Sequence, residues 1–260
     1  MKFHSAVKPK KYLGQHFLKD QEIARKIVAS LSSDSSDILE IGPGTGVLTQ
    51  YIFQRENLKR FFAVDIDTES IEFLKDTHPE WENHIVQGDF LQMDLQAFFP
   101  KHFSVIGNFP YNISSSILFR VFELHAVVDE MVGMFQKEVA ERIAAKPGNK
   151  TYGILSVLLS MFFDIEYLFT VDEHVFNPPP AVKSGVVRLK RNKVSYPDCD
   201  EKLFVKVVKT GFNQRRKTLR NALKPMGIVF PEYCNDLLNK RAEQLSVENF
   251  VFLTRTIKNL

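Results

Sequence analysis

The chain has 260 residues, of which 34 are Lys or Arg and 31 are Asp or Glu, so its formal net charge is only +3. This near-balance excludes a disordered polycation, and a composition of 44% hydrophobic and 25% charged residues is that of a soluble globular protein. The two cysteines, Cys199 and Cys234, are too few for a disulfide framework, so we expect a cytoplasmic protein. The most apolar run, residues 154–163, falls short of the roughly 20 residues that span a bilayer, which favours a buried helix.

The first two-thirds of the chain alternates strand and helix patterns. Short apolar runs predict strands at residues 37–41, 60–65, 85–89, 103–108 and 130–136. Helical spacing between and after them predicts helices at residues 46–55, 68–77, 114–124 and 137–145, with Thr68 as the N-cap of the second. Alternating units of this length predict an α/β fold, a parallel sheet with helices on both faces.

The pattern changes in the last third. Residues 165–171 and 185–190 have strand character and no helix between them, so we expect an antiparallel pair at one edge of the sheet. Beyond Asn192 the strand patterns stop, and helical spacing predicts helices at residues 201–212, 216–223, 231–238 and 246–257. We therefore expect two domains, an α/β domain over residues 1–192 and a small all-α domain over residues 193–260.

Charge is spread unevenly along the chain. Residues 1–20 carry a net +4 and residues 200–260 carry +6, whereas residues 21–199 carry −7. Basic ends around an acidic middle indicate contact with a polyanion.

The densest basic stretch, residues 205–224, holds seven basic residues and no acid. A solvated helix face is one explanation of such a run. Three consecutive cations with Phe, Asn and Gln immediately before them favour an RNA-binding surface instead, because guanidinium groups pair with phosphates and flat side chains stack on bases. The candidate substrate-binding cations are Arg215, Arg216 and Lys217.

A glycine-rich loop, Gly42-Pro43-Gly44-Thr45-Gly46, follows the first predicted strand and opens a helix. Glycines at this position permit a tight turn and let a ligand approach the backbone, which makes Gly42 and Gly44 candidate cofactor contacts; a plain turn is the alternative. The spacing matches neither the dinucleotide fingerprint nor a phosphate-binding loop with its Gly-Lys-Ser/Thr ending.

Carboxylates end the next two predicted strands. Asp65 lies roughly 20 residues beyond the glycine loop, where an acid accepts both hydroxyls of a ribose. Asp89 ends the third strand, and acids at successive strand ends line one crevice of an open α/β sheet. Each acid alone could be an ordinary loop residue. Together with the loop they predict a nucleoside ligand without a pyrophosphate, namely S-adenosylmethionine, with Asp65 on its ribose and Asp89 on its adenine amine.

The fourth predicted strand ends in Asn108-Phe109-Pro110-Tyr111. An exocyclic amine is hard to methylate because its lone pair is delocalised into the base ring. The Asn108 side-chain oxygen and a carbonyl freed by Pro110 can accept its N–H groups and aim the lone pair at a methyl sulfonium. This predicts in-line displacement through orientation and electrostatics, with Tyr111 as a stacking ring for a base that has left its helix. The alternative for this motif is a β-turn with Pro at its second position.

Phe176 precedes the stiff segment 177–180, Asn-Pro-Pro-Pro, and could cover the other face of the flipped base; a core position is the alternative. We expect no metal site. His78 and His84 lack partners at metal-ligand spacing, and the two cysteines form no Cys-x-x-Cys pair.

Taken together, these motifs resemble the KsgA family of small-subunit rRNA adenine dimethyltransferases. The resemblance runs from about Tyr12 to Phe250, nearly the whole chain. The segments that carry it are YLGQHFL, EIGPGTG, GNFPYNIS, FNPPPAVKSGVVRL, FNQRRKTLRNAL and RAEQLSVENF. Three positions differ from the family's commonest pattern: Asp65 stands where Glu is common, Lys183 where Asp is frequent, and His16 where Asn is common.

The resemblance implies S-adenosylmethionine-dependent N6,N6-dimethylation of two adjacent adenines near the 3′ end of the small-subunit rRNA, late in ribosome assembly. It implies a Rossmann-like methyltransferase domain and a helical domain that grips rRNA in an immature ribosomal particle. We expect a monomer that needs neither a metal nor a membrane. By motif position, the family's cofactor contacts fall on His16, Leu18, Gly42, Asp65, Asp89 and Asn108.

Two other functions are compatible with parts of this pattern. A large-subunit rRNA adenine methylase of the resistance type shares the catalytic logic, but the Gln-His-Phe-Leu entry and the Gln-Arg-Arg-Lys-Thr helix favour the small-subunit enzyme. A non-catalytic RNA-binding assembly factor is the second alternative. The intact Asn-x-Pro-Tyr motif and both nucleoside acids argue against it.

Overall fold

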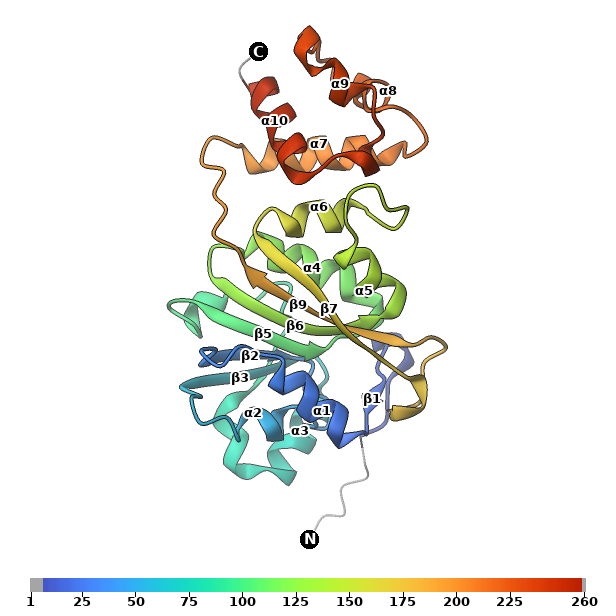
Figure 1. Cartoon of the computed structure of the whole chain (residues 1–260). Helices are drawn as coiled ribbons and strands as arrows, with labels where there is room; N and C mark the ends of the chain where they lie inside the picture. The colour runs from blue at the N-terminus through green and yellow to red at the C-terminus, as the bar shows by residue number, and fades with distance from the viewer. Residues whose placement is uncertain (1–6, 259–260) are drawn as a thin grey trace. The chain divides into compact units, whose positions relative to one another are not determined.

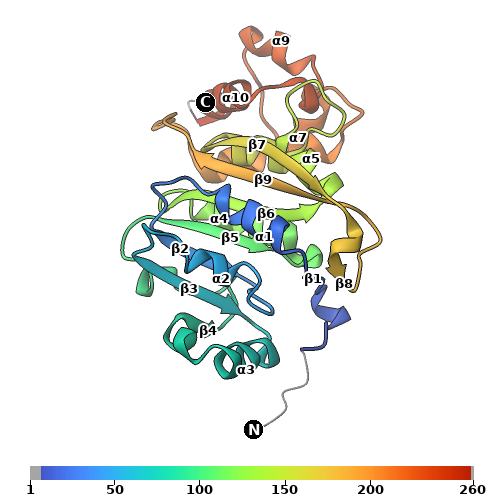
Figure 2. The same ribbon diagram turned by 60° about the horizontal axis from the view of Figure 1, so that its bottom comes forward.

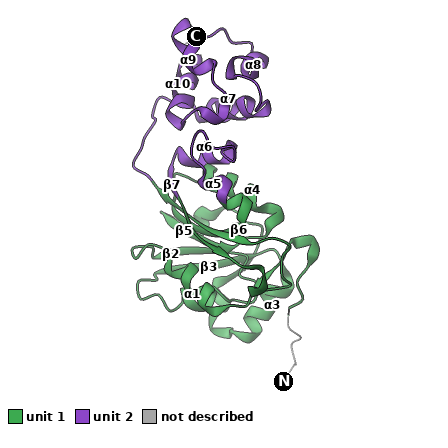
Figure 3. Cartoon of the chain, turned by 45° about the vertical axis from the view of Figure 1, so that its right-hand side comes forward, with its two compact units in different colours: residues 1–140, 166–191 green, residues 141–165, 192–260 purple. Residues whose placement is uncertain are grey.

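The computed structural model describes residues 7–258. Its contacts divide the chain into two compact units, residues 1–140 with 166–191 and residues 141–165 with 192–260 (Figure 3). The second unit therefore includes residues 141–165, which the sequence interpretation assigned to the α/β domain. The reason is that helix α6, Ile154–Ser160, packs against helix α7, Glu201–Asn213, so the apolar run that was expected to be a buried helix serves the helical unit.

A seven-stranded sheet with the order β4-β3-β2-β5-β6-β9-β7 forms the centre of the α/β part (Figure 1). Strands β2 to β6 pair in parallel, and β9 pairs antiparallel with β6. The predicted strand pair at one edge is β9 and β7, which are neighbours there. The strands are β2 (Asp37–Ile41), β3 (Arg60–Asp65), β4 (Ile85–Gln87), β5 (Phe103–Asn108), β6 (Val128–Gln136), β7 (Phe163–Val171) and β9 (Ser184–Arg191).

Helices cover both faces of this sheet (Figure 2). Successive side chains of a strand point to opposite faces. In β6, Val132 and Met134 join a core cluster with residues of α1 to α3, while Met131 and Phe135 on the other face are also fully buried. The helices around the sheet are α1 (Gln21–Ala29), α2 (Thr49–Ile52), α3 (Thr68–Thr77), α4 (Ser114–Glu123) and α5 (Lys137–Ala144), the last of which continues into the second unit.

Two N-terminal features of these helices differ from the sequence analysis. Helix α1 was not predicted, although Asp20 caps it by accepting hydrogen bonds from the Glu22 and Ile23 amides. Helix α3 is capped by Asp67, which accepts from the Glu69 amide, so the expected cap Thr68 is its first helical residue.

The second unit is helical, and residues 192–258 contain no strand. Helix α10 begins after Ser246, whose hydroxyl accepts from the Asn249 amide while the Asn249 side chain accepts from the Ser246 amide. Phe204, Phe212 and Phe250 are buried in its core. Besides α6 and α7, its helices are α8 (Leu219–Leu223), α9 (Asn235–Leu238) and α10 (Val247–Lys258). No helix within residues 7–258 is long and apolar enough to cross a membrane.

Candidate active site

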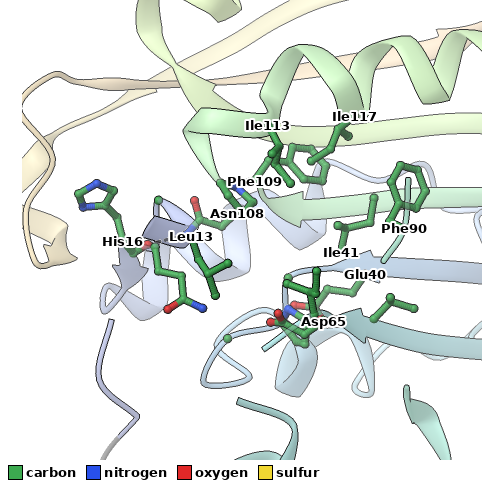
Figure 4. Close-up of a pocket in the computed structure, with 18 of the residues that line it drawn as sticks. Leu13, His16, Glu40, Ile41, Asp65, Phe90, Asn108, Phe109, Ile113 and Ile117 are labelled. Carbon is green, nitrogen blue, oxygen red and sulfur yellow. Dashed lines mark hydrogen bonds between the residues drawn. The ribbon is translucent and has the colours of Figure 1, made fainter. Parts of the chain in front are cut away.

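A cavity lies at the carboxyl ends of β2, β3 and β5, the edge at which ligands bind in open α/β sheets (Figure 4). Its wall consists of the N-terminal segment 13–18, the glycine loop after β2, the ends of β3 and β5, and residues 88–91 after β4. Every predicted cofactor or catalytic residue lies in this wall: His16, Leu18, Gly42, Gly44, Asp65, Asp89, Asn108, Pro110 and Tyr111.

The glycine loop bends in a way that requires its glycines. Gly42 and Gly44 have φ angles of +68° and +57°, in the left-handed region that side-chain-bearing residues rarely adopt. A Cβ on Gly42 would meet only Pro110, at 3.9 Å, so it would project into the cavity space. A Cβ on Gly44 would come within 3.0 Å of the Phe17 ring. The loop thus presents bare backbone to a ligand.

The two predicted nucleoside acids differ in their surroundings. Asp65 is buried and accepts the Asp67 amide at 2.9 Å, and burial raises its pKa to about 6. Asp89 accepts the Leu91 amide at 2.9 Å and the Gln92 side-chain amide at 2.8 Å. These bonds fix the orientation of both carboxylates, and each oxygen can accept more than one hydrogen bond.

A third carboxyl group in the wall, Glu40, was not singled out by the sequence analysis. It is only 1% exposed, and its hydrogen-bond donor is the Thr49 hydroxyl at 2.6 Å. Burial raises its pKa to about 8. The sequence does contain one signal for Glu40: it is an acid within the apolar strand Asp37–Ile41, just before the glycine loop. Its burial depends on helix α2 packing over β2, which the local sequence does not reveal.

The Asn108 side chain is oriented by the N-terminal segment. Its amide nitrogen donates to the His16 carbonyl at 2.9 Å. The side-chain oxygen is the other end of the same amide, so it remains an acceptor at the cavity wall. Residues 92 positions apart in the chain thereby fix the direction of one candidate catalytic group.

Tyr111 is held by two contacts. Its hydroxyl lies 2.6 Å from the Ser184 hydroxyl, and burial raises its pKa. The His16 ring stacks on the Tyr111 ring with centroids 5.5 Å apart, and His16 Nδ1 lies 2.8 Å from the Pro178 carbonyl oxygen. An aromatic pair therefore stands beside Asn108.

Phe176 does not lie where the sequence analysis expected it. Its side chain is 1% exposed, belongs to the core cluster and does not line the cavity. The cause is a short antiparallel pairing of β1 (Phe17–Leu18) with β8 (Phe176–Asn177), in which Phe176 lies opposite the buried Leu18. The core alternative is therefore the correct one for Phe176, and its position does not support stacking on a base.

The three consecutive cations of the second unit have different roles. Arg215 donates to the Lys150 and Tyr152 carbonyls, each at 2.8 Å, and pairs with Glu243 at 3.3 Å. Its Nη2 is thus engaged within the protein although the side chain remains 45% exposed, so Arg215 is a weaker candidate for an RNA contact than its exposed neighbours. Arg216 and Lys217 are exposed, and no ion pair of theirs occurs among residues 7–258. The neighbouring Phe212, expected as a stacking side chain, is buried in the core.

Lys183 forms an ion pair with Asp172 across the loop that joins β7 to β9. At this position, where the family often has an acid, the positive charge of Lys183 is therefore balanced by Asp172. No group of three or more His, Cys, Asp or Glu side chains within the described part of the chain is arranged to hold a metal ion.

The family model described as ribosomal RNA adenine dimethylase matches residues 6–258. The chain belongs to the ribosomal RNA adenine dimethylase family. A relative from Cytophaga hutchinsonii, named ribosomal RNA small subunit methyltransferase A, is 58% identical over 96% of this chain and 98% of its own. A solved dimethyladenosine transferase from Plasmodium falciparum is 29% identical, covers 93% of this chain and 99% of its own, and superposes with a TM-score of 0.76. A 23S rRNA methyltransferase, ErmE, shares the fold at 23% identity, with 92% and 99% coverage and a TM-score of 0.66.

Membership of the dimethylase family makes this protein an rRNA adenine dimethyltransferase that uses S-adenosylmethionine, on a Rossmann-like sheet. The cavity fits that cofactor, which carries a cationic sulfonium and an adenosine but no phosphate. Asp65 and Asp89 line it together with Glu40, whose pKa of about 8 leaves it mostly uncharged at pH 7, and its described wall contains no Lys or Arg. Such a wall favours a cation over a phosphate-bearing nucleotide.

Proposed function

We propose that this dimethyltransferase acts on the small-subunit rRNA, converting two adjacent adenines near its 3′ end to N6,N6-dimethyladenine in an immature ribosomal particle. The name of the Cytophaga hutchinsonii relative supports the choice of subunit. The observation that carries the chemistry is the orientation of Asn108, whose amide nitrogen is committed to His16 and whose oxygen is left to accept from the target amine. A cytoplasmic monomer is the proposed form.

The Asn108 oxygen and a main-chain carbonyl beside Pro110 accept the two N–H groups of adenine N6. Accepting both bonds draws the lone pair out of the ring and directs it along the line of attack. When bound, S-adenosylmethionine supplies an electrophilic methyl group on its sulfonium. Tyr111 holds the base, because its ring is fixed between the bond to Ser184 and the stacked His16 ring. No side chain is required to remove a proton before attack, because the positively charged N6 that forms on methyl transfer can release its proton to water afterwards.

The cofactor contacts follow from the cavity wall. Asp65 accepts the ribose hydroxyls, and Asp89 accepts from the adenine amine. Gly42 and Gly44 admit the cofactor against the backbone, while His16 and Leu18 close the cavity from the N-terminal side. The helical residues 193–260 serve as the rRNA-binding domain, with Arg216 and Lys217 as phosphate contacts.

The likeness to ErmE, at 23% identity, concerns the fold and does not favour the large subunit. The decisive experiment offers the protein both substrates. Purified small and large ribosomal subunits that lack the modification are incubated separately with labelled methyl donor, and the modified nucleotides are mapped. We expect two adjacent dimethyladenines in the small-subunit RNA. Label in the large-subunit RNA would support the resistance-type alternative, and tight binding without label would support a non-catalytic assembly factor.

A further inference from the structure

The N-terminal segment lies directly against the catalytic segment after β5. The Tyr12 carbonyl accepts from the Asn112 side-chain amide at 3.4 Å. Gly14 has a φ angle of +66°, and a Cβ there would stand 2.7 Å from the Asn112 side-chain oxygen. Together with the bond from Asn108 to His16, these contacts fix residues 12–16 at the side of the cavity where Asn108 and Tyr111 are found.

Tyr12 is 76% exposed, more than any other aromatic residue among those described. Tyr12 immediately precedes Leu13, which lines the cavity, so an exposed ring next to the reaction site is available to stack on a base. Its neighbours Lys8 and Lys11 are also exposed, and neither has an acidic partner within residues 7–258. An exposed ring that follows two unpaired cations in the chain matches the chemistry of single-stranded nucleic acid binding.

Lys10, between those two cations, has a different role. Its ammonium pairs with Asp67 and Glu69, and its backbone amide donates to the Gln15 side chain at 2.8 Å. The Gln15 side-chain amide donates in turn to Asp67 at 2.9 Å. Asp67 is buried at the start of α3, so it anchors this turn of the chain to the sheet edge. These contacts hold the backbone next to Tyr12 in place. Of the lysines at positions 8, 10 and 11, they neutralise only Lys10.

We propose that Lys8, Lys11 and Tyr12, the Tyr12 platform, bind the unpaired nucleotide next to the target adenine, with its base stacked on the Tyr12 ring and its phosphates near the two lysines. This inference rests on the proposed function, because it requires a target base extruded from structured RNA. An extruded base leaves its neighbour without a stacking partner on one side. The Tyr12 ring replaces that partner, and so it favours the open RNA conformation over the closed one.

The test measures kcat/KM for methylation of unmodified small subunits and, separately, cofactor affinity by calorimetry. Tyr12→Ala is expected to lower kcat/KM about tenfold and to leave cofactor affinity unchanged, since one stacked base is worth a factor of that order. Tyr12→Phe, which keeps the ring, should retain near wild-type values. Lys11→Ala should reduce the salt slope of RNA binding by about 1. Lys59→Ala is the charge-matched control. Lys59 is exposed just before β3, at the amino ends of the parallel strands, whereas the cavity lies at their carboxyl ends.

A kcat/KM for Tyr12→Ala within twofold of wild type would overturn the proposal, and so would a matching loss of cofactor affinity. Binding to a single-stranded adenine-rich RNA oligomer separates RNA from protein partners. If Tyr12→Ala weakens activity on particles but leaves oligomer binding unchanged, the ring contacts a ribosomal protein and the platform is refuted. If wild-type protein methylates no small subunits, the proposed function fails first and this inference fails with it. If the wild-type protein methylates small subunits and Tyr12→Ala leaves kcat/KM unchanged, only the Tyr12 platform is refuted and the proposed function stands.

Discussion

The cavity of the α/β unit and the basic stretch of the helical unit were both predicted from short sequence motifs. The motifs predicted the surroundings of the residues more accurately in the cavity than in the basic stretch. In the cavity, the distant residues Gly42, Asp65 and Asn108 meet because parallel strands end at the same edge. In the basic stretch, adjacent cations differ in their partners: Arg215 donates to two backbone carbonyls, whereas no such bond of Arg216 occurs within residues 7–258. A motif at the end of a strand predicts where its residues lie in the structure, whereas a run of charged residues predicts only that the segment is basic.

The largest effect that would test the cavity is expected from Asn108→Ala. Loss of the acceptor for adenine N6 should reduce kcat by about 10²–10³-fold, the range found when one preorganised hydrogen-bonding group is removed from an active site. Cofactor affinity, measured by calorimetry, should fall less than tenfold, because Asn108 is one contact among many in the wall. Turnover comparable to wild type would remove Asn108 from the reaction.

The next effect concerns Asp65 and pH. The charged form accepts ribose hydroxyls, and burial raises the pKa of the free protein's Asp65 to about 6. Cofactor affinity should therefore be lost as pH falls through 6. Asp65→Asn should weaken binding about tenfold or more at pH 8 and flatten this dependence. Calorimetry between pH 5 and 8.5 measures both, and Asp37→Asn, at the opposite end of β2, is the control. A wild-type affinity that stays constant through pH 6 would contradict the assignment.

A smaller effect would sharpen the division between the two arginines. Arg216→Ala should weaken rRNA binding several-fold and reduce its salt slope by about 1, with no change in melting temperature. Arg215→Ala should instead lower stability by about 1–3 kcal/mol, because two backbone carbonyls lose a charged donor. Filter binding at several salt concentrations and thermal unfolding distinguish the two. Equal changes in salt slope would return Arg215 to the RNA surface.

The last effect concerns stability rather than activity or binding, and it is expected for Glu40. Its pKa is raised from 4.5 to about 8 in the folded state, so its contribution to stability is fully present below pH 4.5 and is lost as pH rises through 8. Glu40→Gln removes the titration, and its side-chain oxygen can still accept from Thr49. The melting temperature of the variant relative to wild type should rise by about 10 °C between pH 5 and 8.5, since the shift corresponds to several kcal/mol at about 1.4 kcal/mol per pKa unit and each kcal/mol moves the melting temperature by about 2–4 °C. A difference that is independent of pH would show that Glu40 does not titrate in this range.

Most of the sheet could be predicted from the sequence because its strands are short, mostly apolar runs bounded by glycine or polar residues. The predicted bounds of β2, β3 and β5 agree with the structure, as do those of α3. Helix α1 had a clear signal, with Asp20 as its cap and a buried face at Ala24, Ile27 and Val28, but it was not recognised.

The residues that were misplaced depend on contacts between distant segments. Phe176 is one of 23 Phe residues, and nothing near it in the chain shows that β8 pairs with β1. The hydrogen bonds of Arg215 reach the carbonyls of residues 150 and 152, more than 60 positions away. Asp67 and Thr68 are both good N-caps, and the end of β3 decides between them.

The acidic wall of the cavity, without Lys or Arg, also bears on catalytic turnover. Converting one adenine to its dimethyl form consumes two donor molecules, so the spent cofactor must leave before the second transfer. Methyl loss turns the sulfonium into a neutral thioether, which removes one positive charge from a site lined by carboxyl groups. On charge alone, we therefore expect the wall to attract the spent donor less strongly than the loaded one.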